Sequence, residues 1–169
     1  MSNRHVVVHT GLLGDVTVVA SGEAVVGVYF PHHWVKPAPA VLGDEVVGDP
    51  LLDEAARQLT EYLAGERVAF DLPLAAEGDS FQLKVWAILA EIPYGATTSY
   101  GEIAERLGDR SLAQSVGQAV GRNPLSVIVP CHRVVGKDGK LTGYAGGLKR
   151  KKALLDLEEP AEVRAARLF

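Results

Sequence analysis

The chain has 169 residues, of which 47% are hydrophobic and 22% are charged, and its formal net charge is −4. This length and composition support a real hydrophobic core, either in one domain or in two small lobes, and they exclude a protein coated in basic charge. No apolar run reaches the length of a membrane span, and the N-terminus lacks the pattern of a secretory signal. We therefore expect a cytoplasmic protein without membrane contact.

The first half is predicted to form a β meander followed by a helix. Valine-rich segments separated by glycine-containing turns cover His5–His9, Asp15–Ala20 and Ala24–Phe30, and a loop rich in Pro and Gly follows over residues 31–50. Apolar residues at helical spacing then predict a helix over 51–63 that ends at Gly65, a strand over Val68–Leu74 and a linker near Ala75–Asp79.

The second half is predicted to be mainly helical. Asp79 or Ser80 can cap a first helix that Pro93-Tyr94-Gly95 terminates. Ser99 and Glu102 form a capping-box pattern that opens a short helix through Leu107. Ser111 and Gln114 form a second such pattern, with Gln114 reaching back to Ser111, and open a helix that runs to about Gly121. Two short helices joined by a glycine-containing turn match a helix-turn-helix.

The predicted second helix and its surroundings are unusual in size and charge. Its small residues would let it approach a groove closely, although close helix packing inside the domain explains them equally well. Residues 106–152 contain ten Lys or Arg but only two acids, whereas residues 1–79 contain four basic and twelve acidic side chains. A local basic field is expected where one face meets a polyanion, but a solvated basic surface would have the same composition.

Cys131 is the only cysteine, so it cannot form an intrachain disulfide or a multi-cysteine metal site. It is either an inert buried thiol, as a cysteine after an apolar run usually is, or a nucleophile. His132 and Arg133 follow it directly. On an extended segment neighbouring side chains point in opposite directions, so a base role for His132 requires a turn or a bridging water.

The surroundings of Cys131 favour a nucleophile. Asn123-Pro124 can fix a turn before it, and the glycine-rich segment 140–147 follows it. Glycines let backbone N–H groups approach a ligand, and Tyr144 offers a flat surface to a planar ring, which suits a flipped nucleotide base. Each feature also has a purely structural reading, as a turn former, a core aromatic or a hairpin.

These motifs together resemble the O6-alkylguanine-DNA alkyltransferase family. The matching segments are 81–86, 92–95, 99–104, Asn123-Pro124, Pro130–Val134 and 143–147, and the similarity is strong from about residue 78 to 159 and weaker before it. The resemblance implies an α/β (α+β) fold with a ribonuclease H-like support domain over 1–77. A mainly helical, winged-helix-like domain with the helix-turn-helix would cover 78–169.

The resemblance also implies a reaction and roles for individual residues. Cys131 would take the alkyl group from O6-alkylguanine, and from O4-alkylthymine, in duplex DNA after base flipping, irreversibly and once per molecule. His132 would act as a water-mediated base oriented by Glu158, and Asn123 and Tyr100 would assist. The base would contact Val134, Tyr144, Ala145 and Gly146, and the DNA would contact Arg110, Ala113, Gln114, Ser115, Gly117 and Arg122. No cofactor is implied, and we expect a monomer, with cooperative DNA binding left open.

Two departures from the family pattern stand out. Gln114 occupies the position where relatives usually carry an arginine that fills the gap left by the flipped base, so we expect weaker stabilisation unless Arg110 or Arg122 compensates. Some relatives bind zinc in the first lobe, but this chain has no cysteine there, and His32-His33 is a poor zinc set, so we predict no metal.

Three alternative functions remain to be compared with alkyl transfer. A lesion-binding relative that does not repair should lack the cysteine. A helix-turn-helix regulator with a structural cysteine should have an effector or dimer region, for which the acidic first lobe offers no clear candidate. A thiol hydrolase should turn over many times.

Overall fold

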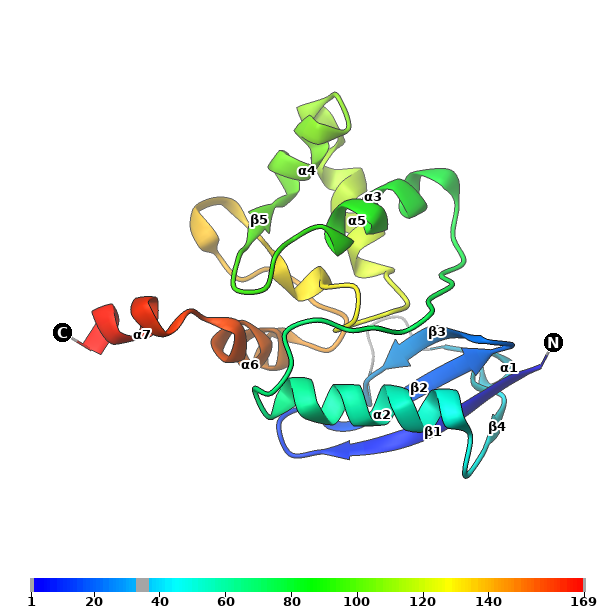
Figure 1. The fold of residues 1–169 in the computed structure, drawn as a ribbon. Coiled ribbons are helices and arrows are strands. Elements are labelled where there is room, and N and C mark those ends of the chain that lie inside the picture. The colour runs from blue at the N-terminus through cyan, green and yellow to red at the C-terminus, as the bar shows by residue number, and fades with distance from the viewer. Residues whose placement is uncertain (1, 33–36, 169) are drawn as a thin grey trace.

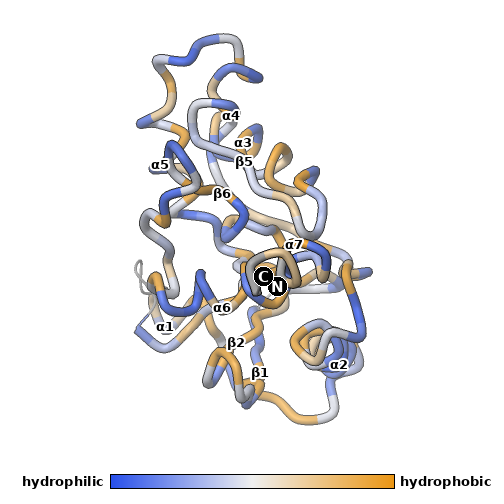
Figure 2. Tube along the Cα trace, turned by 90° about the vertical axis from the view of Figure 1, so that its left-hand side faces the viewer, coloured by the Kyte–Doolittle hydropathy of each residue, from blue (hydrophilic) through white to orange (hydrophobic). Residues whose placement is uncertain are grey.

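The computed structural model describes residues 2–32 and 37–168, which form a sheet lobe and a helical lobe stacked on each other (Figure 1). Figure 2, turned by 90°, shows α3, α4 and α5 in the upper lobe and β1, β2 and α2 in the lower one. The predicted α+β class is confirmed by this arrangement. No helix within the described residues is long and apolar enough to cross a lipid bilayer.

The sheet lobe contains the predicted meander. Strands β1 (Asn3–Thr10), β2 (Gly14–Ser21) and β3 (Ala24–Tyr29) pair antiparallel, and β4 (Asp44–Glu45) adds a short parallel edge to β1, giving the order β3-β2-β1-β4. The predicted loop over 31–50 therefore contains β4 and a short helix, α1 (Pro39–Leu42), within its described part.

Helix α2 (Pro50–Leu63) packs on the sheet and ends before Gly65, as its apolar spacing predicted. Asp49 caps its N-terminus through Leu52 N, and Pro50 occupies the first helical turn, where no backbone donor is needed. Its buried face includes Leu52, Leu59 and Tyr62, which are each at most 3% exposed. Tyr62 at the end of this face reaches toward the helical lobe.

The predicted strand over Val68–Leu74 is wrong. The segment is extended but irregular, and its one strand-like pairing is an isolated bridge between Leu74 and Val25. The buried Gln58 side chain bonds both the N–H and the carbonyl of Asp71, at 2.8 and 2.9 Å. Because the Gln58 side chain satisfies the backbone N–H and carbonyl of Asp71, these groups do not pair with a neighbouring strand, and the apolar pattern does not lead to a β-strand.

The helical lobe comprises the remaining elements. They are α3 (Ser80–Ala90), β5 (Thr98–Ser99), α4 (Tyr100–Arg106), the 3₁₀ turn η1 (Arg110–Leu112), α5 (Ala113–Gly121), the 3₁₀ turn η2 (Cys131–Arg133), β6 (Val134–Val135), the 3₁₀ turn η3 (Lys137–Gly139), α6 (Leu148–Glu158) and α7 (Ala161–Leu168). Asp79 and Gln82 form a complete capping box on α3. β5 and β6 pair in parallel, which places the start of α4 beside the segment after Cys131.

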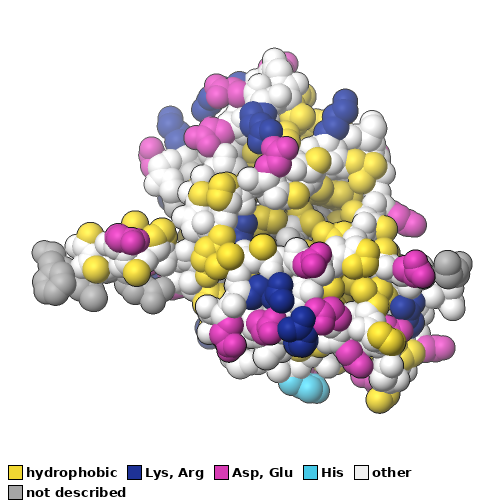
Figure 3. Space-filling model, in the orientation of Figure 1, with side chains coloured by type: hydrophobic (Ala, Val, Ile, Leu, Met, Phe, Trp, Pro, Cys, Tyr) yellow, Lys and Arg dark blue, Asp and Glu magenta, His cyan; other side chains and the backbone are white. Residues whose placement is uncertain are grey.

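The lobes meet along the free edge of β3. Val28 N donates to Pro124 O of the helical lobe at 2.8 Å, and on the same edge Val25 exchanges backbone bonds with Pro73 and Ala75 of the segment that leads to that lobe. Hydrophobic side chains are visible in the hollow between the lobes (Figure 3). A single buried cluster continues from Val28 and Phe30 of the sheet lobe to Leu125 and Tyr144 of the helical lobe. The sheet lobe therefore supports the segment that precedes Cys131.

Candidate active site

A tight turn over residues 123–130 positions Cys131. The buried Asn123 amide donates to Val129 O at 2.9 Å and accepts from Leu125 N at 3.0 Å. Between these bonds Val127 has a φ of 72°, a left-handed conformation that is rare for a β-branched residue. Surrounding contacts must impose such a conformation, and it is common at functional sites.

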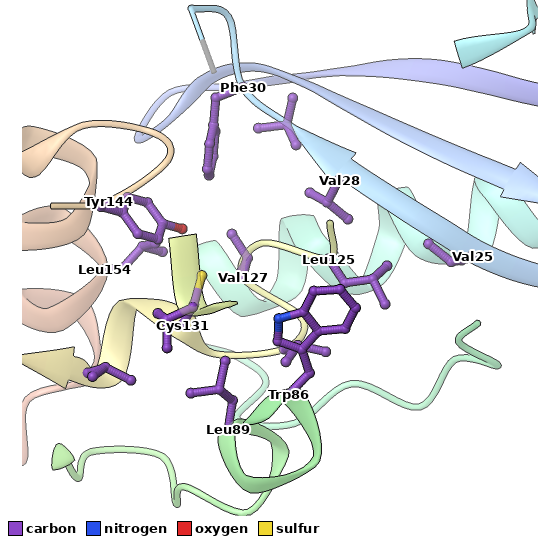
Figure 4. Packing of buried hydrophobic residues seen from close by; sticks show 14 of the residues in the cluster. Val25, Val28, Phe30, Trp86, Leu89, Leu125, Val127, Cys131, Tyr144 and Leu154 are labelled. Atoms are coloured by element: carbon purple, nitrogen blue, oxygen red, sulfur yellow. The ribbon is translucent and has the colours of Figure 1, made fainter. Parts of the chain in front are cut away.

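Cys131 begins the 3₁₀ turn η2 and is 3% exposed. Burial, the largest influence, raises the pKa of its thiol, while Asn123, the Lys151 charge and the Ser126 hydroxyl lower it. Figure 4 shows the sulfur directed into the buried region that also contains the Tyr144 hydroxyl. A thiol held neutral in this way needs a base before it can act as a nucleophile.

His132 lies in the same turn, so the strict alternation of an extended segment does not apply to this pair. Its ring is fully buried, and its Nε2 lies 2.9 Å from Glu158 Oε2. Its Nδ1 has no hydrogen-bond partner within the described residues. Burial, the largest influence, lowers the pKa of His132, so its imidazole is neutral and can accept a proton. With Nε2–H donating to the carboxylate, Nδ1 carries the free lone pair.

Glu158 ends α6 and is 2% exposed. It accepts bonds from Arg133 Nε at 2.7 Å, from Arg133 Nη2 at 2.8 Å and from the Tyr62 hydroxyl, besides the His132 bond. Burial alone would raise the pKa of this carboxyl, but the bonds from His132, Arg133 and Tyr62 lower it to about 2. Glu158 is therefore a fixed negative charge that orients His132.

The residues expected to contact the base are buried in the structure. Val134 is fully buried in β6, and Tyr144 and Ala145 are 6% and 4% exposed. Gly146 is buried too, and a Cβ placed on it would lie 2.5 Å from a Phe30 ring carbon. Lys151 fixes the start of this loop, since its Nζ donates to Thr142 O at 3.1 Å. Burial lowers the pKa of Lys151 to about 8, so it is largely cationic at neutral pH.

A groove of about 520 Å³ lies between α4, α5 and the glycine loop. It is lined by Tyr100, Ala113, Gln114, Gly117, Gln118, Val120, Gly121 and Gly143. The Tyr100 hydroxyl is 2.8 Å from Thr142 Oγ1, so the groove adjoins the loop that Lys151 holds. Four of the residues expected to contact DNA or the base thus share one surface, namely Tyr100, Ala113, Gln114 and Gly117.

The other residues expected to contact DNA lie elsewhere. Ser115 is exposed on α5 but does not line this groove. Arg110 forms an ion pair with Glu105 of α4. Arg122 is exposed and lines a different hollow, beside Asn123 and Pro124. Neither arginine lies in the groove with Gln114, so the structure does not support compensation from their present positions.

The second predicted capping box is wrong. Asp109 caps the turn η1 by accepting from Ser111 N at 2.9 Å, and α5 starts after Leu112 with no side-chain cap. Gln114 therefore does not bond back to Ser111, because the 3₁₀ turn shifts the helix start by one residue, from Leu112 to Ala113. Its exposed side chain remains available to a ligand in the groove.

Several site residues escaped sequence reasoning. Lys151 counted only as part of a basic run, although it falls seven residues before Glu158 and thus on the same helical face. Arg133 was noted as a neighbour of Cys131 but not as a partner of Glu158. Tyr62 was placed on the apolar face of its helix, and nothing in its local sequence indicates a contact 96 residues away.

The described residues contain no cluster of three or more His, Cys, Asp or Glu side chains that could hold a metal ion. Of the two histidines considered for zinc, His32 belongs to no such cluster among the described residues, and His33 lies outside them.

Comparison with known proteins identifies both lobes. Residues 7–76 match the model of the 6-O-methylguanine DNA methyltransferase ribonuclease-like domain, and residues 80–160 match that of the DNA-binding domain of the same family. A methylated-DNA--protein-cysteine methyltransferase of Methanosarcina acetivorans is 54% identical over 113 residues, which cover 67% of this chain and 72% of that protein.

Solved structures agree with these sequence matches. The crystal structure of Mycobacterium tuberculosis OGT in complex with DNA is similar with a TM-score of 0.82 and 40% identity, covering 95% of this chain and 97% of that one. An O6-methylguanine DNA methyltransferase from Methanococcus jannaschii has a TM-score of 0.63 and 30% identity, with 90% and 92% covered.

Proposed function

Because the chain belongs to the 6-O-methylguanine DNA methyltransferase family, it is a DNA repair protein that transfers alkyl groups to a cysteine, and we propose that Cys131 is the acceptor. The observation that carries this assignment is a buried, unpartnered ring nitrogen beside the thiol. His132 Nδ1 has no hydrogen-bond partner within the described residues, and His132 follows Cys131 in the same turn. Buried polar groups normally have partners, so this free lone pair suits a bridging water that takes up the thiol proton.

The substrate is an O6-alkylated guanine turned out of duplex DNA, with O4-alkylthymine as a second lesion. The Cys131 sulfur attacks the alkyl carbon, a sulfur–carbon bond forms, and the carbon–O6 bond breaks. The thiol proton passes through a bridging water to His132 Nδ1, and the departing guanine takes up one proton in exchange. Glu158 keeps His132 in the tautomer that has a free Nδ1, and its charge stabilises the imidazolium.

In this proposal the base is read along its edge by backbone groups. Backbone groups of Cys131, Val134 and Ala145 face its edge, Tyr144 lines the pocket beside Gly146, and Tyr100 assists flipping from the groove side. Protein–DNA contact comes from α5 and its flanks, through Ala113, Gln114, Ser115, Gly117, Arg110 and Arg122. Gln114 enters the gap that the base leaves, where it can hydrogen-bond but brings no charge.

The chain acts once per molecule. The product is a thioether, and no second thiol exists to resolve it. The protein works as a monomer in the cytoplasm, where a reducing environment keeps the thiol free. The division into a support domain over 1–77 and a DNA-binding domain over 78–169 stays a prediction. A lesion-binding protein that does not repair is not favoured, since Cys131 is present.

The test uses excess duplex oligonucleotide that contains O6-methylguanine. One methyl group should appear on the Cys131 peptide by mass spectrometry, with one repaired lesion per protein molecule. Cys131→Ser should retain DNA binding and lose repair, and an oligonucleotide with ordinary guanine is the control for adventitious methylation. Repeated turnover, or repaired DNA beside an unmodified Cys131, would refute the assignment.

A further inference from the structure

The sheet lobe supplies one side chain to the group of residues behind Cys131. Tyr62 of α2 is 1% exposed, and its hydroxyl donates to Glu158 Oε2. The same oxygen lies 2.9 Å from His132 Nε2. Tyr62 is therefore one bond away from the imidazole, although it precedes Glu158 by 96 residues and belongs to the other lobe.

The Tyr62 contact is more specific than the packing of this region requires. A buried tyrosine hydroxyl needs a partner, and a backbone carbonyl satisfies that need. The neighbouring Tyr94 shows this solution, because its hydroxyl donates to Leu157 O at 3.3 Å. Tyr62 instead donates to the charged carboxylate. Its ring packs against Phe70, with centroids 5.1 Å apart, and edge-on against Tyr94, at 6.1 Å, so the direction of the hydroxyl is fixed.

We infer that Tyr62 is a positioning residue for the alkyl-transfer reaction, because its hydroxyl fixes the Glu158 carboxylate that orients His132. This inference rests on the proposed roles of Cys131 and His132. It also gives the sheet lobe a part in the chemistry, beyond supporting the turn at Pro124.

A positioning role of this kind alters proton affinity as well as geometry. Each donor to Glu158 draws off part of its negative charge, so removal of the Tyr62 hydroxyl leaves a more basic carboxylate. Such a carboxylate holds the protonated form of His132 more strongly and raises the pKa of the imidazole. The other charges that face this pair are Arg133, which bonds Glu158, and Lys151, whose charge acts on His132. Both stay in place when only a hydroxyl is removed.

The experiment follows single-turnover methyl transfer to Cys131 at several pH values. Tyr62→Phe removes the donor, while 3,5-difluorotyrosine at position 62 makes the donor stronger in nearly the same shape. General base catalysis typically contributes about 10²- to 10⁴-fold, so we expect Tyr62→Phe, with a less well oriented His132, to be at least about tenfold slower near neutral pH. The acid limb of its pH–rate profile should move to higher pH, and that of the difluorotyrosine protein to lower pH.

Tyr94→Phe is the matched control, since it removes a half-buried hydroxyl from the same aromatic cluster, and that hydroxyl donates to Leu157 O. It should keep the pH–rate profile of the unchanged protein. A profile for Tyr62→Phe that superimposes on that of the unchanged protein overturns the inference, as does an equal shift in Tyr94→Phe. If Tyr62→Phe does not fold, the difluorotyrosine protein decides the question. An unshifted pH–rate profile for that protein overturns the inference. Failure of the unchanged protein to methylate Cys131 would instead refute the proposed function.

Discussion

Asn123 is the residue whose removal should most directly damage the turn before Cys131. In Asn123→Ala the carbonyl of Val129 keeps its bond from Cys131 N at 2.8 Å, but the N–H of Leu125 loses its partner inside the protein. The left-handed Val127 lies in the middle of the turn, so the chain there has a competing conformation available once the amide is gone. We therefore expect both lower stability and a displaced thiol.

The size of the effect follows from these contacts. A buried backbone group left without a partner costs about 1–3 kcal/mol, and the bond lost at Val129 O adds about 1 kcal/mol. The free energy of unfolding should fall by about 2–4 kcal/mol, which most domains of this size survive. Misplacement of a reacting group by about 1 Å can cost about a hundredfold in rate. Methyl transfer by Asn123→Ala should therefore be about ten- to a hundredfold slower.

Urea unfolding and single-turnover transfer measure the two effects. Ser126→Ala is the matched control for stability, because Ser126 is buried in the same turn but its hydroxyl holds no backbone group of that turn. It should cost less than about 1 kcal/mol. If Asn123→Ala were no less stable than Ser126→Ala, with an unchanged dependence on urea, the reasoning about the turn would be refuted.

Three further changes test other parts of the site. Gln114→Arg should raise the repair rate on duplex DNA but not on single-stranded DNA, and an equal or lower duplex rate would contradict the role given to this position. Glu158 has a pKa of about 2 in the folded protein against an ordinary 4.5, so its charge stabilises the fold above pH 4.5 and this stabilisation is lost as the pH falls toward 2. Glu158→Gln should therefore have a lower free energy of unfolding at neutral pH. In acid-induced unfolding, its free energy of unfolding should depend less steeply on pH than that of the unchanged protein. Gly146→Ala should slow transfer by forcing the loop away from Phe30, and Phe30→Leu should partly restore the rate measured in the same single-turnover assay.

Local signals predicted much of the fold. The meander, the ends of α2 and the cap of α3 at Asp79 depend on residues close in sequence, and the structure has each of them. The prediction failed where a distant or competing side chain bonded the backbone in place of the expected partner. The Gln58 side chain bonds the backbone of Asp71, where a strand ladder was expected. Asp109, two residues before the expected cap Ser111, caps the 3₁₀ turn η1.

The candidate site divides in the same way. Cys131 and His132 could be named from a short motif, and Glu158 from a family resemblance. Lys151 and Tyr62 could not, because their significance lies in contacts made across the fold by residues that look ordinary locally. A buried lysine and a buried tyrosine acquire their chemical roles only from neighbours that the packing of the lobes supplies.

The left-handed Val127 has a consequence for protein engineering. Its conformation opposes the preference of its own side chain, so contacts made by other residues impose the shape of the turn before Cys131. Two of these contacts are the hydrogen bond from the Asn123 amide to Val129 O and the bond from Val28 N, on the edge of β3, to Pro124 O. A peptide of residues 123–133 copied into another scaffold would relax and present an ordinary thiol. Reactivity can be transplanted only together with the strand edge that holds the turn.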